Sequence, residues 1–227
     1  MDYQGLELEN FDKAVIWRQY SYLLIKKYIN NNVLEVGAGI GSFTKNYEKK
    51  VKNITLSETD DSNYNLLVNE FKDKNNIKII NSFTSQINET FNTILYLNVL
   101  EHIEKDVEEI NQALKKLKAN GHLIILVPAH NELYGKFDEV IGHFKRYKTD
   151  FFKSLKLTNA EVLELYYLDS LGYLLYYLNK IFFKEEEYPT KLKIFFWDKL
   201  FTPFSMILDK LLYYKLGKKV MCIIKKN

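Results

Sequence analysis

A glycine-rich loop that directly follows a short apolar segment constrains this chain more than any other feature. Residues 33–36 read Val-Leu-Glu-Val, and Gly37-Ala38-Gly39-Ile40-Gly41 comes at once after them. Glycine lets the backbone approach a ligand closely, and a helix that begins after such a loop offers free N–H groups to that ligand. The pattern therefore predicts a strand, a ligand-binding turn and then a helix over about 42–50.

The rest of the chain alternates apolar runs with segments of helical periodicity. Further strands are predicted at 54–57, 77–80, 93–97, 122–127, 161–168 and 218–224, and helices at 14–29, 60–72, 103–118, 149–155, 170–183 and 191–215. Strands that alternate with helices imply a parallel sheet covered on both faces. The predicted fold class is α/β: a Rossmann-like, doubly wound, mostly parallel seven-stranded sheet with a helical insertion before the last strand.

The spacing of the glycines narrows the ligand. A dinucleotide site favours Gly-x-Gly-x-x-Gly, but the residue three after Gly39 is Ser42, which disfavours a dinucleotide oxidoreductase. Two carboxylates flank the loop in the expected fold. Glu35 lies two residues before the first glycine. Glu58 follows the second strand directly, where a carboxylate can accept hydrogen bonds from ribose hydroxyls.

Three stretches resemble the class I methyltransferases that use S-adenosylmethionine (SAM): VLEVGAGIGSF at 33–43, LSETD at 56–60 and LNVLEHIEKD at 97–106. The resemblance covers about residues 33–128 and implies SAM as cofactor. It also implies the cofactor-binding set Glu35, Gly37, Ala38, Gly39, Gly41, Glu58, Thr59, Ser82, Phe83, Asn98, Val99 and His102.

Each part of that set has an expected role. Glu35 and the loop surround the methionine part of SAM, and Glu58 binds its ribose. Asn81-Ser82-Phe83 stands where the family usually has an acidic adenine contact, so Ser82 with a stacking Phe83 is the expected substitute. Asn98, Val99 and His102 pass under the cofactor, and His102 is expected to stabilise the loop rather than act as a base.

The acceptor site is expected in the connection 129–150, because ligands bind beyond the carboxyl ends of parallel strands. Residues 128–147 resemble a subgroup of sugar- and envelope-associated methyltransferases, with a Leu-Tyr-Gly turn at 133–135 and a His-x-x-Arg-Tyr ending. The candidate catalytic residues are His143 as general base, Arg146 as partner of an acceptor carboxylate or phosphate, and Tyr147. The alternative is that His143 and Arg146 only pin the loop to the domain.

The predicted organisation has three parts: an N-terminal helical cap (1–32), a SAM-binding core (33–169 with 217–227) and an aromatic helical insertion (170–216). The insertion contains many of the 17 Tyr and 15 Phe residues. Four interpretations of it stay open: packing on the core, lining the acceptor pocket, lying on a membrane surface as a peripheral contact, or forming a homodimer.

Composition limits the remaining choices. The formal net charge of +3 and the lack of a separate basic module give no reason to expect nucleic acid as partner. Cys222 is the only cysteine, and we predict no metal site. No uncharged apolar run reaches 18 residues, so we expect a cytoplasmic protein, or one peripheral at the membrane.

The sequence therefore predicts a methyltransferase acting on O or N of a small-molecule or glycan-type acceptor, including sugars and lipid-linked molecules. The alternatives are a nucleic-acid or protein methyltransferase and a non-catalytic scaffold of the same fold.

Overall fold

The computed structural model of this chain describes residues 11–182 and 188–227. In this part of the chain seven strands form one sheet in the order β3-β2-β1-β4-β5-β7-β6. The strands are β1 (Asn32–Val36), β2 (Asn53–Ser57), β3 (Ile77–Ile80), β4 (Phe91–Leu97), β5 (Leu117–Pro128), β6 (Ala160–Leu168) and β7 (Lys219–Lys226). The α-helices are α2 (Val15–Ile25), α3 (Asp61–Phe71), α4 (Asp106–Lys116), α5 (Lys136–Val140), α6 (Thr149–Lys153), α7 (Ser170–Phe182), α8 (Lys191–Phe196) and α9 (Thr202–Leu211).

The sheet is mixed, because β7 runs antiparallel to both of its neighbours, β5 and β6, whereas the pairs from β3 to β5 are parallel. Val36 at the end of β1 is in register with Ser57 of β2 and Tyr96 of β4. The carboxyl ends of these strands therefore meet at one edge. The chain leaves β1 toward β2 and later places β4 on the other side, and ligands bind beside such a switch point.

One predicted helix does not form, and a second is shorter than predicted. Residues 42–50 form only a 3₁₀ turn, η2 (Thr44–Asn46), because Ser, Thr and Asn favour local hydrogen bonds over helix and the Thr44 and Tyr47 side chains bond to Glu35 instead. The helix predicted at 103–118 begins at Asp106 and ends at Lys116, because β5 begins at Leu117, five residues earlier than predicted.

Two apolar clusters cover the two faces of the sheet. Ile124 and Leu126 of β5 belong to the cluster under α2, while Leu123, Ile125 and Val127 belong to the cluster under α4. All five side chains are buried. This agrees with the predicted continuous apolar strand, because a central strand covered on both faces needs apolar residues at every position.

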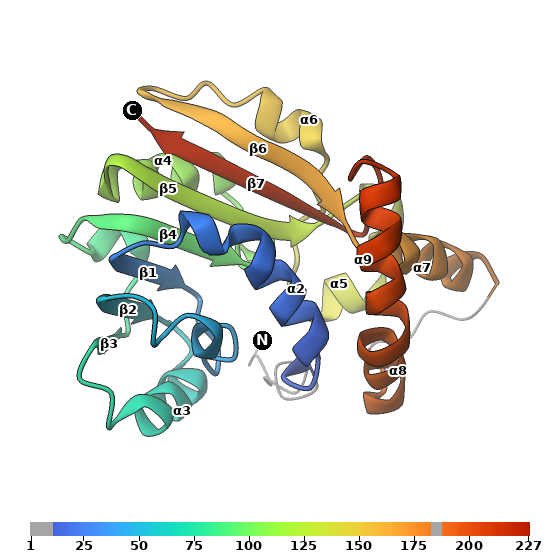
Figure 1. The fold of residues 1–227 in the computed structure, drawn as a ribbon, viewed down its shortest axis with the longest axis horizontal. Coiled ribbons are helices and arrows are strands. Elements are labelled where there is room, and N and C mark those ends of the chain that lie inside the picture. The colour runs from blue at the N-terminus through green and yellow to red at the C-terminus, as the bar shows by residue number, and fades with distance from the viewer. Residues whose placement is uncertain (1–10, 183–187) are drawn as a thin grey trace.

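The insertion helices lie beyond the ends of β5, β6 and β7, at the right of Figure 1. Two buried aspartates tie them to the rest of the chain. The Asp198 carboxylate accepts the backbone N–H groups of Ile16 and Trp17 at 3.2 and 2.8 Å, and so caps the first turn of α2. Asp209 of α9 accepts the Tyr20 hydroxyl of α2 at 2.9 Å, and it also caps the start of α7 by accepting the Ser170 N–H at 2.8 Å.

A π-helical turn, η6 (Trp197–Phe201), joins α8 to α9. Pro203 lies in the first turn of α9, where its missing N–H removes one helical hydrogen bond. None of the helices in the described part of the chain is long and apolar enough to span a bilayer.

Candidate active site

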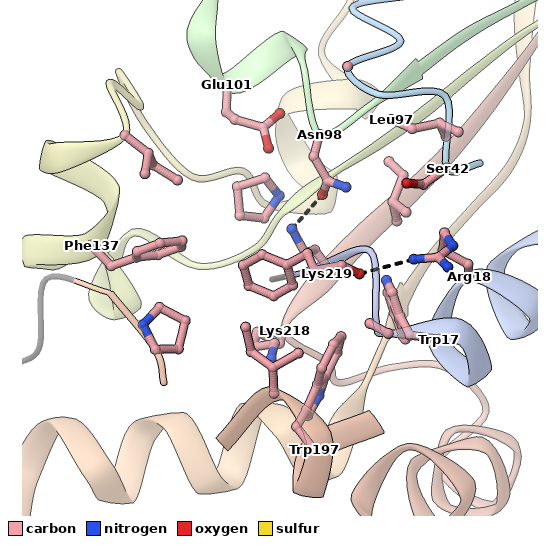
Figure 2. Close-up of a pocket in the computed structure, with 18 of the residues that line it drawn as sticks. Trp17, Arg18, Ser42, Leu97, Asn98, Glu101, Phe137, Trp197, Lys218 and Lys219 are labelled. Carbon is pink, nitrogen blue, oxygen red and sulfur yellow. Dashed lines mark hydrogen bonds between the residues drawn. The ribbon is translucent and has the colours of Figure 1, made fainter. Parts of the chain in front are cut away.

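A cavity of about 1290 Å³ lies at the carboxyl ends of the central strands. Its walls come from α2, the glycine loop, the loops after β2 and β4, the start of β7 and the insertion helices. Figure 2 shows Asn98 and Glu101 facing the cavity from one side, and Lys218, Lys219 and Trp197 from the other. The cavity therefore joins segments that are far apart in sequence.

The glycine loop forms the floor beside β1. Gly37 has φ +60°, a conformation that glycine adopts without strain, and a Cβ built on it would lie 2.7 Å from Cγ2 of Val99. The Ala38 N–H donates to the Ser57 carbonyl at 3.1 Å, which fastens the loop to the end of β2. A side chain at position 37 would thus collide with the Val99 side chain.

Glu35 is buried at the end of β1 and lines the cavity. Thr44 Oγ1 and Tyr47 OH donate to its Oε2 at 2.7 and 2.5 Å, so neither of these bonds uses Oε1. Burial raises the pKa of Glu35 to about 7, and the two hydroxyl hydrogen bonds only partly offset that effect. The group is therefore poised to ionise when a cation approaches it.

Glu58 links the glycine loop to the loop after β2. Its Oε2 accepts the Gly39 N–H at 2.8 Å, and its Oε1 accepts the N–H groups of Thr59 and Asp60 at 2.8 and 3.0 Å. Glu58 and Thr59 both line the cavity. The predicted ribose contact remains a prediction, and the structure adds a role in shaping the loop.

The other predicted cofactor residues divide into two groups. Asn98, Val99 and His102 line the cavity, and Asn98 Oδ1 accepts a hydrogen bond from Lys219 Nζ at 2.5 Å. Ser82 and Phe83 are not among its lining residues, and Phe83 is 65% exposed. The structure therefore does not bring Ser82 and Phe83 to the cavity wall, and their contact with adenine stays a prediction.

The predicted acceptor loop is organised around Asp138, which is fully buried. Arg146 donates to both carboxylate oxygens, from Nε at 2.9 and 3.0 Å and from Nη2 at 2.9 Å, and His143 Nδ1 lies 2.7 Å from Oδ1. Burial alone would raise the pKa of Asp138, but the bonds and charges of His143 and Arg146 outweigh it and lower the pKa to about 2. This geometry matches the anchoring alternative for Arg146.

His143 and Tyr147 lie differently with respect to the cavity. His143 lines it and turns Nε2 toward Glu101, 3.8 Å from Oε1. Tyr147 is buried in the core, where its hydroxyl donates to Asp106 Oδ2 at 2.9 Å and also contacts the Leu100 carbonyl at 3.1 Å. Since Tyr147 is not brought to the cavity, its hydroxyl supports the fold and does not face an acceptor.

Glu101 is a cavity residue to which the sequence analysis gave no role. It is fully buried, and neither side-chain oxygen has a hydrogen-bond partner among the described residues. Burial raises the pKa of this carboxyl group. The neighbouring His102 ring packs edge-on against His143 at 4.6 Å, and burial, followed by the charge of His143, lowers the pKa of His102 to about 4.

Two lysines at the start of β7 were also missed. Lys218 lies 3.2 Å from Asp169 Oδ2, and burial lowers the pKa of Lys219 to about 8. The available signal was a pair of cations directly before an apolar strand. This signal could not show that the lysines reach the cavity. They do so because β7 pairs antiparallel with β5, which places the start of β7 next to the end of β5.

Comparison with known proteins gives the family. Residues 11–169 match the model of a methyltransferase domain, so the chain belongs to that family. This confirms the superfamily predicted from the sequence, while the sugar- and envelope-associated subgroup remains a prediction.

Individual relatives are distant. An uncharacterised protein of Methanocaldococcus jannaschii, MJ1123, is 26% identical over 189 residues, which are 81% of this chain and 85% of that protein. Coclaurine N-methyltransferase, solved with N-methylheliamine and S-adenosylhomocysteine (SAH), superposes with a TM-score of 0.63 at 15% identity, covering 94% of this chain and 72% of the other. The N-methyltransferase NodS of Bradyrhizobium japonicum, solved with SAH, gives 0.58 at 13%, covering 100% and 89%.

Proposed function

We propose that this protein transfers the methyl group of SAM to an oxygen or nitrogen of an amphiphilic acceptor, such as a lipid-linked sugar. The observation that carries the proposal is the position of Glu35 and the glycine loop at the switch point of the sheet, open to one large cavity. Family membership supports the reaction class, and SAH in two related folds supports the cofactor.

The residues present fit SAM. Glu35 offers a carboxylate to the ammonium group of the methionine part. In the loop from Gly37 to Gly41 only Ala38 and Ile40 carry side chains, so the cofactor can approach the loop backbone closely. Arg18 of α2 lines the same cavity and offers a cation to the cofactor carboxylate. When bound, SAM supplies a methyl group on a positively charged sulfur, so the protein's main task is to align the acceptor atom with it.

The far wall of the cavity supports this acceptor class. This wall is mostly apolar, and its residues come from α5 and the residue after it, from α7, from α8 and from the π-helical turn: Phe137, Ile141, Leu175, Leu178, Leu192, Phe196 and Trp197. Leu178, Leu192 and Phe196 are also 48%, 64% and 47% exposed, so the apolar wall continues to the molecular surface. An acceptor with an apolar tail can occupy this wall while its polar end reaches the cofactor side.

Calorimetry tests the cofactor. SAH should bind at one site per chain, whereas NAD should give no heat. At pH 6 SAH binding should release a proton, because the SAH ammonium favours ionisation of Glu35, whose pKa is about 7 in the free protein. The released proton appears as a dependence of the binding heat on the buffer. Binding of NAD in place of SAH would refute the proposal.

A labelled-methyl transfer screen tests the acceptor. Polyprenyl-linked sugars should accept methyl groups better than soluble nucleotide sugars or small amines. The variant Leu175→Gln, in the apolar wall, should lower kcat/KM for the lipid-linked acceptor and leave the SAH affinity unchanged. Leu163→Gln on β6, outside the cavity, is the matched control. Equal activity of wild type and Leu175→Gln toward that acceptor would refute the apolar wall as its binding site.

We further propose that the insertion rests on an anionic membrane surface. Exposed apolar residues repeat at helical spacing along α8, η6 and α9, and define the α8–α9 apolar stripe: Leu192, Phe195, Phe196, Leu200, Phe204, Ile207 and Leu211. The two acidic residues of 191–215, Asp198 and Asp209, are fully buried, while Lys191, Lys199, Lys210 and Lys215 are exposed. An apolar stripe with exposed cations is typical of an interfacial helix. A symmetric dimer through this stripe is less favourable, because it would bring the lysines of the two subunits together at one interface.

Vesicle co-sedimentation distinguishes a membrane from a second copy of the chain as the partner of the α8–α9 apolar stripe. The protein should bind vesicles containing phosphatidylglycerol, and should do so more weakly in high salt and with pure phosphatidylcholine. Phe204→Ser combined with Ile207→Ser should abolish binding, whereas Leu66→Ser, at an exposed leucine on α3, should not. A stable dimer in light scattering that the double variant dissociates, without vesicle binding by wild type, would overturn the membrane proposal.

A further inference from the structure

The three side chains Glu101, His102 and His143 converge in the cavity wall. One ligand atom of each lies within 4.8 Å of the others, and His143 Nε2 is 3.8 Å from Glu101 Oε1. Two imidazoles and one carboxylate form a ligand set suited to divalent first-row transition metals, with positions left open for other ligands. The arrangement comes from two separate loops, after β4 and after α5.

The second observation is the state of Glu101. It is fully buried, yet both of its carboxylate oxygens lack a hydrogen-bond partner among the described residues. A buried carboxylate without partners is costly, and such groups are normally paired or bound to a metal. The charge of Lys219 partly offsets the effect of burial on the pKa of Glu101, but Lys219 Nζ donates its hydrogen bond to Asn98 Oδ1 (Figure 2). Both Glu101 oxygens therefore stay without a hydrogen bond among the described residues.

The third observation is the orientation of His143. Its Nδ1 is held by Asp138, which Arg146 holds in turn, so Nε2 is the nitrogen that faces Glu101. A metal-ligating histidine almost always bonds through its other nitrogen to a carboxylate or a carbonyl, which fixes the ring and its tautomer. The buried Asp138–Arg146 pair thus has the geometry of such a support.

We propose that Glu101, His102 and His143 bind one divalent first-row transition metal ion, of which Zn²⁺ and Co²⁺ are suitable probes. All three residues line the cavity, so an oxygen of the acceptor can complete the coordination of the ion. His143 is then a metal ligand, which replaces the general-base role expected from the sequence. This extends the proposed methyl transfer, but the metal site itself does not depend on that function.

The test uses the full chain, freed of metal with a chelator and without SAM. Co²⁺ should bind at one ion per chain and give the visible absorption of a coordinated ion, and Zn²⁺ should compete for the same site in calorimetry. Zn²⁺ should also raise the midpoint of thermal unfolding. Glu101→Gln and His102→Gln should each weaken Zn²⁺ binding by roughly 10-fold to 100-fold or more.

The matched control is His122→Gln. The chain has four histidines, two in the cluster and two outside it, and His122 lies on β5 away from the cavity. This control should bind Zn²⁺ like wild type. Glu101→Gln preserves side-chain size, and a far-UV circular dichroism spectrum like that of wild type would show that this variant folds. The proposal is overturned if Co²⁺ and Zn²⁺ do not saturate at one ion per chain, or if Glu101→Gln binds them as wild type does. Neither result depends on whether SAH binds.

Discussion

Arg146 and Asp138 form a buried ion pair in which the guanidinium donates to both carboxylate oxygens at 2.9–3.0 Å. The pair lies between the loop that carries His143 and helix α7, where Arg146 also stacks on the Tyr176 ring at 4.9 Å. The acceptor side of the cavity is therefore fixed by an internal pair. Arg146 also lines the cavity, and its Nη1 has no hydrogen-bond partner among the described residues, so its contact with an acceptor anion stays a prediction.

Asp138→Asn should destabilise the fold by about 3–5 kcal/mol, because it leaves the Arg146 charge buried without its partner. Urea denaturation followed by circular dichroism measures this loss. Asp150→Asn removes an exposed partner of Lys153 and should cost about 0–1 kcal/mol. Similar losses in the two variants would contradict the structural role given to Asp138.

Glu35 should make stability depend on pH. Its folded pKa of about 7 lies above the ordinary value of 4.5, so between these values the folded state holds a proton that the unfolded state has released. The contribution of this group to the free energy of unfolding is fully present below pH 4.5, and it is lost as the pH rises to about 7. At about 1.4 kcal/mol per pKa unit, the loss amounts to about 3 kcal/mol. Glu35→Gln should lack this decline. Parallel stability curves for wild type and Glu35→Gln would show that the pKa is not raised.

Glu58→Ala should weaken SAH binding by about 1–3 kcal/mol, the typical cost of leaving polar groups without partners. The backbone N–H groups of Gly39, Thr59 and Asp60 all lose their acceptor, so the glycine loop loses its fixed shape as well as the proposed ribose contact. Calorimetry with Glu70→Ala as control measures the effect, since Glu70 pairs with Lys45 at the surface. An unchanged affinity in Glu58→Ala would remove Glu58 from the cofactor site.

Gly37→Ala should lower both stability and SAH affinity. The new methyl group meets Val99 at 2.7 Å, and crowding of this kind costs about 1–3 kcal/mol. Gly142→Ala is a close control, because Gly142 also has positive φ (+79°) but open space around its Cβ position. The difference between the two variants in chemical denaturation isolates the crowding from the backbone strain. No difference would mean that Val99 yields freely.

Local sequence patterns determined the fold class and the core of the candidate cofactor site. Continuous apolar strands, a glycine loop after the first of them and carboxylates at two strand ends are properties of neighbouring residues. Local patterns therefore predicted Glu35, the loop, Glu58 and Asn98, and all of these line the cavity except Gly41, which packs against Phe71 of α3. The predicted helix at 42–50 was wrong, because tertiary bonds from Thr44 and Tyr47 to Glu35 decided that segment.

Only the tertiary structure decided which distant residues meet. Glu101 and His143 are 42 positions apart, and they meet because the loop after α5 folds back onto the loop after β4. The Phe144 N–H of the first loop donates a hydrogen bond to the Glu101 carbonyl of the second and so holds the two loops together. The buried roles of Asp138, Asp198 and Asp209 likewise depend on long-range packing. Periodicity reports which face of an element is apolar, but it carries no information about which polar groups of other elements will share a buried space.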